Sequence, residues 1–177
     1  MARPEGFSSD EAFNSVWSRR SVALYKAMVA YRYHRRRQRF FDLLDKWTKA
    51  FTVIAGASLL ADSIKRNVPL IAMTISGFGL LSLVFAYGDR KQSHKELSEA
   101  YALLASKIEG TPTSQLASPL VALWEAEVVA LNAKEPPQLH ALVIICEREQ
   151  SIANGHPDHI PLLPLSKRLL ADWFSFG

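Results

Sequence analysis

The side chains best suited to chemistry lie in the C-terminal part of the chain. His156, Asp158 and His159 carry the nitrogen and oxygen atoms that metal ions take as ligands. A structural zinc site needs about four ligands of compatible geometry, and no second cluster of Cys and His accompanies this one. We therefore interpret the run as an exposed loop and predict no metal site.

The sequence lacks the strong catalytic motifs. It contains no phosphate-binding glycine loop, no Gly-x-Ser-x-Gly elbow and no His-Glu-x-x-His pair. Glu147 and Glu149 flank Arg148, which favours a solvated helix face. The single cysteine, Cys146, lies in an apolar run, so a buried structural thiol is favoured over a reactive one. These features argue against an enzyme and predict no cofactor.

Two apolar stretches, 49–64 and 68–87, stand in the middle of the chain and are joined by Lys65, Arg66 and Asn67. The second has no charge, and as a helix it would rise about 30 Å, the thickness of the hydrocarbon core of a bilayer. The first, which reaches the lower limit for a span when it starts from Trp47, carries one acid, Asp62, near its end. The sequence thus predicts an all-α membrane protein with a two-transmembrane-helix hairpin.

The hairpin divides the 177-residue chain into four predicted segments. Residues 1–47 form an N-terminal juxtamembrane helix. Residues 48–88 form the hairpin, with spans at about 48–64 and 68–87. Residues 89–110 extend the second helix into the cytoplasm, and residues 111–177 form a C-terminal helical cap.

Basic residues flank both predicted spans and account for the net charge of +4. Basic residues near spans mark the side that is not translocated, which places both termini in the cytoplasm and the protein in the inner membrane. Nucleic-acid phosphates are an alternative partner for such a cluster, but lipid headgroups are favoured beside a span. The predicted interface anchors are Arg32, Arg35, Arg36, Arg37, Arg39, Trp47, Arg90 and Lys91.

Small residues inside the spans predict close helix packing, either within the hairpin or between subunits. They are Ala57, Ala61, Ala72, Ser76, Gly77 and Gly79. After the second span, Leu97, Tyr101, Leu104 and Ile108 repeat at helical spacing. This stripe requires a partner helix, and we expect it to join copies of the chain in a homo-oligomer.

Residues that typically begin or end helices predict the bounds of the remaining helices. Ser8-x-x-Glu11 starts a helix near Ser9, and Gly110-Thr-Pro ends the stripe helix. Ser118-Pro119 opens the next helix as cap and first turn. A further helix runs over about 139–153 and stops at Asn154-Gly155, and a last short helix carries Leu165, Leu169, Trp173 and Phe176.

The order Tyr31-x-Tyr33-His34-Arg-Arg-Arg-Gln-Arg-Phe40-Phe41, two apolar stretches, a basic helical exit and then Cys146-Glu-Arg-Glu149 before Gly155 resembles the SLATT group of bacterial two-span membrane proteins. The resemblance implies an effector that permeabilises the inner membrane when a sensor protein or nucleotide-signalling module detects infection, as in anti-phage defence. The residues that match are Tyr33, His34, Arg36, Arg37, Phe40, Phe41, Glu149 and Gly155.

Two functions from different classes stay open. The first is an oligomeric effector that permeabilises the membrane when a partner or signal triggers it. The second is a non-enzymatic membrane scaffold or exclusion factor that binds a protein partner through its cytoplasmic helices. A hairpin buried in a helical bundle, without a membrane, is a third interpretation of the apolar stretches.

Overall fold

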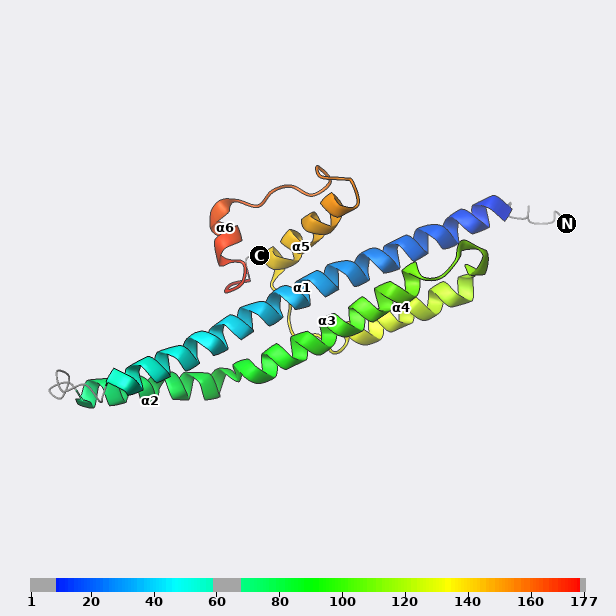
Figure 1. Cartoon of the computed structure of the whole chain (residues 1–177). Helices are drawn as coiled ribbons and strands as arrows, with labels where there is room; N and C mark the ends of the chain where they lie inside the picture. Colours follow the sequence, from blue (N-terminus) through cyan, green and yellow to red (C-terminus); the bar gives the residue numbers. More distant parts are fainter. Residues whose placement is uncertain (1–8, 59–67, 176–177) are drawn as a thin grey trace. The chain divides into compact units, whose positions relative to one another are not determined.

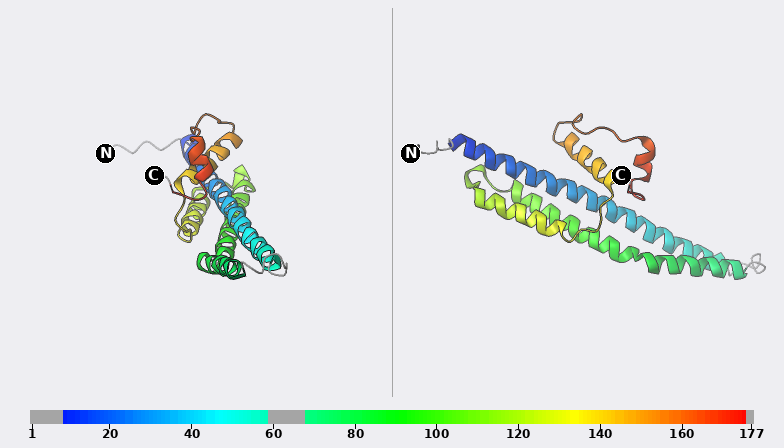
Figure 2. Two further views of the ribbon diagram at one scale, coloured as in Figure 1. Left: turned by 90° about the vertical axis from the view of Figure 1, so that its left-hand side faces the viewer. Right: turned by 180° about the vertical axis from the view of Figure 1, so that it is seen from behind.

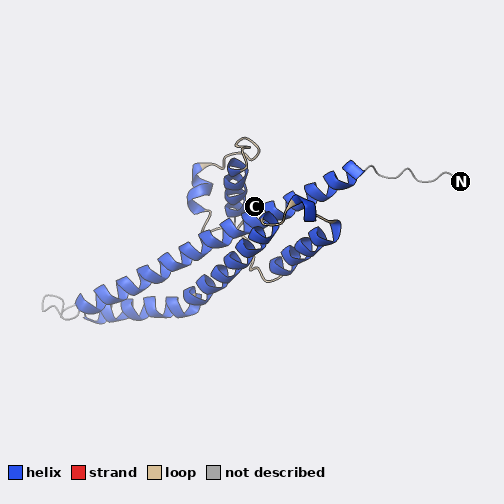
Figure 3. Ribbon diagram, turned by 45° about the vertical axis from the view of Figure 1, so that its right-hand side comes forward, coloured by secondary structure: helices blue, strands red, loops and turns tan. Residues whose placement is uncertain are grey.

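Helices make up all the regular secondary structure in residues 9–58 and 68–175, the part of the chain that the computed structural model describes (Figure 1, Figure 3). The all-α prediction is confirmed. The elements are α1 (Ser9–Ser58), α2 (Val68–Phe85), α3 (Tyr87–Glu109), the short 3-10 helix η2 (Thr113–Gln115), α4 (Ser118–Asn132), α5 (His140–Ala153) and α6 (Leu165–Leu170).

The predicted transmembrane hairpin is wrong, because no helix in the described ranges combines the length and the apolarity needed to cross a membrane. Ala86 has a φ of 43°, and α2 ends just before it, at Phe85. α2 therefore comprises 18 residues and stops two residues before the predicted end of the second span. The first predicted span is described only as far as Ser58; Ala61, Asp62 and the 65–67 turn lie outside the described residues.

The chain divides into two compact units. Unit 1 comprises Met1–His34 and Glu96–Gly177, and unit 2 comprises Arg35–Lys95. The boundaries fall inside α1 and α3, so each of these helices contributes to both units.

The sequence predicted most helix ends within about a residue. α1 begins at Ser9, α3 ends just before Gly110, and α5 ends at Ala153. One cap differs: the N-cap of α4 is Ala117, without a side-chain hydrogen bond, and Pro119 lies in the first turn. The Ser118 hydroxyl instead accepts a hydrogen bond from Arg19 Nη1 at 3.1 Å, so it ties α4 to α1.

The first core of unit 1 joins α1, α3 and α4, whose ribbons lie side by side in Figure 2. Leu97, Tyr101, Leu104 and Ile108 are all buried, at 0–6 % exposure. Tyr101, Leu104 and Ile108 share one core with Ala23, Ala27, Val121, Trp124 and Val128 of the same chain. The expectation that this stripe joins copies of the chain is therefore corrected, because α1 and α4 already cover it.

The second core of unit 1 packs α5 and Ala171 against α1. Val29 and Tyr33 of α1 meet Ala141, Leu142 and Cys146 of α5. Cys146 is fully buried, which confirms the prediction of a buried thiol. Arg32 Nε donates a 2.8 Å hydrogen bond to Gln150 Oε1, so a polar contact accompanies the apolar one.

In unit 2, the C-terminal part of α1 runs alongside α2 and the first turns of α3 (Figure 1). The buried ring of Phe41 stacks on His94 at 5.6 Å between centroids. The Arg37 guanidinium lies 4.6 Å from the Phe41 centroid, and that of Arg90 lies 5.9 Å from it. Lys91 Nζ pairs with Asp42 Oδ1 at 2.7 Å, so cations and aromatic rings join α1 to α3 here.

Candidate functional site: a buried polar centre

The most distinctive polar cluster of unit 1 lies where α1, α3 and the loop after α4 meet. α1 supplies His34, α3 supplies Tyr101, and the loop between α4 and α5 supplies Glu135 and Gln138. The loop exists because Pro136 and Pro137 cannot continue α4. The break leaves Glu135 just past the helix end, with its side chain only 5 % exposed.

The Glu135 carboxylate is the hub of this buried polar centre. His34 Nε2 lies 3.1 Å from Oε1, and the Tyr101 hydroxyl lies 2.5 Å from the same oxygen. Gln138 Nε2 donates to the other oxygen, Oε2. The Tyr101 hydroxyl is also 2.6 Å from Asn132 Oδ1, so its one proton is shared between two acceptors.

Aromatic contacts hold the histidine in place. The His34 ring is fully buried and stacks on Tyr101, with centroids 5.8 Å apart and planes 8° apart. Tyr33 meets the same ring edge-on at 5.2 Å. The Tyr33 hydroxyl accepts a 3.0 Å hydrogen bond from the backbone N–H of Leu139, which anchors the loop to α1.

The environment shifts two pKa values in opposite senses. Burial by itself raises the pKa of Glu135, but hydrogen bonds from His34, Tyr101 and Gln138, together with the charge of His34, outweigh it and leave that pKa lowered. Burial raises the pKa of Tyr101, and the hydrogen bond to Glu135 and its negative charge raise it further. Glu135 is thus held ionised and Tyr101 is held neutral.

This arrangement suits positioning better than catalysis. The donors around Glu135 compensate the loss of water that burying a carboxylate entails. His34 and Tyr101 are 0 % exposed, so a substrate has no direct access to them. The centre therefore specifies how α1, α3 and the α4–α5 loop come together.

The structure separates the residues of the family motif. Tyr33 and His34 belong to the buried polar centre in unit 1. Arg37, Phe40 and Phe41 form the aromatic and cationic contacts of unit 2, where Arg36 is half-buried. Glu149 is exposed on α5, and Gly155 ends that helix.

Gly155 has a structural reason for being glycine. Its φ is +85°, a conformation that side chains disfavour. The His156 N–H donates to Ser151 O at 2.9 Å, and the Gly155 N–H donates to Ile152 O at 3.0 Å. This pair of bonds is the Schellman ending of an α helix.

The predicted interface anchors occupy several environments. Arg32 is bonded to Gln150 in unit 1. Arg37, Arg90 and Lys91 make the contacts of unit 2 described above. The remaining predicted anchors are half-buried Arg36 and exposed Arg35, Arg39 and Trp47.

Among the predicted packing residues, Ala57, Ala72, Ser76 and Gly79 are exposed and Gly77 is half-buried. A Cβ built at Gly77 or Gly79 would meet no atom within 4 Å. Ala61 lies outside the described part of the chain.

Sequence reasoning missed Glu135, Asn132 and Gln138. The Glu135-Pro-Pro-Gln138 run signals a helix break, but it does not indicate that the broken segment faces His34 and Tyr101. His156 and His159 are exposed and line a cavity with Tyr25, Ser151 and Asn154. No family model matches the chain, and no curated protein and no solved structure gives a significant match.

Proposed function

We propose that the protein is a non-enzymatic effector that binds a lipid bilayer through the apolar surface of unit 2, with unit 1 as the part that receives a partner or signal. The observation that carries the proposal is an exposed apolar stripe on α1. Leu43, Trp47, Phe51 and Ile54 are 43–69 % exposed, and they fall within an arc of about 80° at about 100° per residue.

The exposed surface of α2 points to lipid rather than to a protein groove. Ala72, Met73, Thr74, Ser76, Gly79 and Leu80 are all exposed. At about 100° per residue they cover an arc of about 220° of the helix. A protein groove contacts one apolar face of a helix, so an exposed arc of this width exceeds what a groove covers.

Charge supports an anionic bilayer. Arg35, Arg39, Arg90 and Lys95 are exposed and belong to unit 2. Basic residues near an anionic membrane surface each contribute about 1 kcal/mol of attraction. Trp47 is 67 % exposed, and tryptophan favours the level of the lipid headgroups.

Vesicle flotation and dye release together test the proposal. We expect the full chain to float with vesicles that contain phosphatidylglycerol, to bind phosphatidylcholine vesicles less, and to release a trapped dye. Ile54→Asp and Leu80→Asp should each reduce flotation at least tenfold. Leu103→Asp is the matched control, because Leu103 is 60 % exposed but belongs to unit 1.

A membrane scaffold is the second candidate. Unit 1 exposes Leu103, Leu123 and Val129 at 60–67 %, and the second candidate assigns these side chains to contact with a protein partner. Flotation without dye release would favour the scaffold over the effector. Failure of the wild-type chain to float with either kind of vesicle would contradict both candidates.

A further inference from the structure

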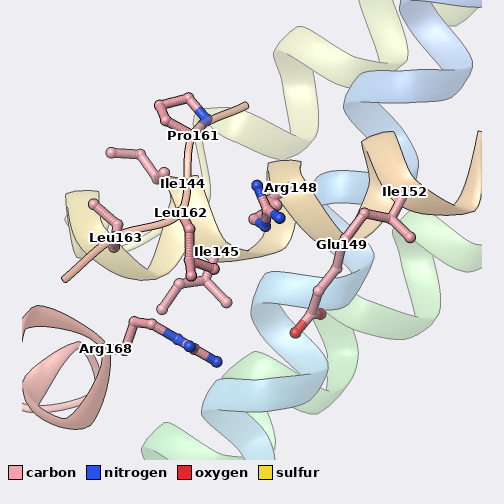
Figure 4. Close-up of a pocket in the computed structure, with 9 residues that line it drawn as sticks. All are labelled: Ile144, Ile145, Arg148, Glu149, Ile152, Pro161, Leu162, Leu163 and Arg168. Atoms are coloured by element: carbon pink, nitrogen blue, oxygen red, sulfur yellow. The ribbon is translucent and has the colours of Figure 1, made fainter. Parts of the chain in front are cut away.

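A cavity in unit 1 lies between α5 and the segment that leads to α6 (Figure 4). We name it the α5–α6 pocket. Its volume is about 280 Å³. Ile145 and Ile152 of α5 and Leu162 and Leu163 of the opposite segment give it an apolar lining. It is separate from the buried polar centre, because neither His34 nor Glu135 lines it.

Two guanidinium groups belong to the same lining, Arg148 from α5 and Arg168 from α6. Arg148 Nη1 donates to the carbonyl oxygen of Ile160. This bond holds the Arg148 guanidinium at the edge of the pocket. A guanidinium has several N–H donors, so this bond leaves others to meet a ligand. Figure 4 shows the Arg168 side chain extending from α6 and passing below Ile145, with Arg148 above Ile145.

The pocket carries a net positive charge. Glu149 adds one negative charge to the lining, so its three ionisable groups sum to about +1 at neutral pH. No carboxylate in the described ranges lies within ion-pair distance of Arg168. A ligand with a single negative charge therefore complements the net charge of the lining.

We propose that the α5–α6 pocket binds a small carboxylate with an apolar body. The carboxylate meets Arg148 and Arg168, because guanidinium groups match carboxylates in shape and charge. The body lies among Ile145, Leu162 and Leu163. A volume of about 280 Å³ holds roughly nine water-sized groups, which suits an acyl chain of medium length.

Octanoate is the probe that tests this site, with the full chain and without vesicles. Isothermal titration calorimetry should show saturable binding with a Kd below about 1 mM. Arg168→Gln should weaken binding at least tenfold, and Arg168→Lys should weaken it less. Lys167→Gln is the matched control, because it removes a neighbouring charge of α6 that does not line the pocket.

Two further ligands separate charge from apolarity. 1-Octanol has the apolar body without the charge, and acetate has the charge without the body; each should bind at least tenfold more weakly than octanoate. Circular dichroism should show unchanged helix content in Arg168→Gln. The proposal is overturned if octanoate does not saturate, if octanol binds as tightly, or if the folded Arg168→Gln binds like wild type. Because no bilayer is present, none of these results depends on the proposed membrane function.

Discussion

His34 Nε2 lies 3.1 Å from Glu135 Oε1, although about a hundred residues separate the two in the chain, and their side chains are 0 % and 5 % exposed. A buried pair of this kind fixes geometry more than it adds stability, because both groups lose their water. Its consequence for unit 1 is that α1 and the α4–α5 loop have one favoured register.

Glu135→Gln should destabilise the protein. The substitution removes the charge that faces His34 and turns one acceptor into a donor opposite Gln138. Breaking a buried pair by changing one partner costs about 3 kcal/mol, measured by urea unfolding followed by circular dichroism. Glu127→Gln is the control, because the Lys107–Glu127 pair is half-exposed and should change stability by less than about 1 kcal/mol. Equal stability of the two variants would contradict a central role for Glu135.

Stability should fall in acid through Glu135. Its folded-state pKa lies below the ordinary value of 4.5, so the unfolded chain takes up the proton first as the pH drops. The stabilisation is fully present above that ordinary value and is lost as the pH falls through the folded pKa. Thermal unfolding from pH 7 to pH 3 should show the gap between wild type and Glu135→Gln narrowing in acid. If the difference in melting temperature between wild type and Glu135→Gln is the same at pH 7 and pH 3, protonation of Glu135 does not account for the loss of stability in acid.

Lys91→Gln should raise the pKa of Asp42. Hydrogen bonds from Lys46 and Lys91 lower that pKa from 3.8 to about 2. The stabilisation from the ionised carboxylate is therefore present above 3.8 and is lost as the pH falls toward 2. NMR titration of the side-chain carboxyl measures the change directly. Lys49→Gln should leave the titration unchanged, because Lys49 pairs with Asp45 instead.

Leu104→Ala should destabilise the chain far more than Leu103→Ala. Leu104 is 0 % exposed in the core of unit 1, and its neighbour Leu103 is 60 % exposed. Truncating a buried leucine costs about 2–5 kcal/mol, whereas truncation on the surface usually costs less than about 0.5 kcal/mol. The same urea titration compares the two. If the free energy of unfolding does not depend on protein concentration, the face formed by Leu97, Tyr101, Leu104 and Ile108 is covered within one chain.

Gly155→Ala should destabilise α5 by about 1–2 kcal/mol, because the left-handed backbone at φ +85° disfavours a Cβ. Gly88→Ala is the matched control: Gly88 lies in the first turn of α3, where a Cβ would meet no atom within 4 Å. That change should be neutral or stabilising by up to about 1 kcal/mol. Thermal melts of both variants measure the contrast, and similar losses would argue against the Schellman ending.

The sequence by itself determined the helical class and most helix ends. Gly110, Pro119 and Gly155 act through local backbone geometry, so their effect does not depend on distant residues. The periodicity of Leu97, Tyr101, Leu104 and Ile108 likewise revealed a buried face. Periodicity identifies the buried face but not the segment that packs on it, so it predicts an oligomer contact as readily as the contact with α1 and α4 that the structure shows.

Only the tertiary structure revealed the buried polar centre and the helices that the apolar stretches form. Glu135 reaches His34 because the proline break turns the chain back toward α1, and no local pattern encodes a contact over that separation. The end of the second apolar stretch differs for another reason: hydropathy averages over a window and does not register the φ of 43° at Ala86, so the predicted span runs to residue 87 whereas α2 ends at Phe85. Local interactions determined where helices form, and packing between distant segments determined what each helix face meets.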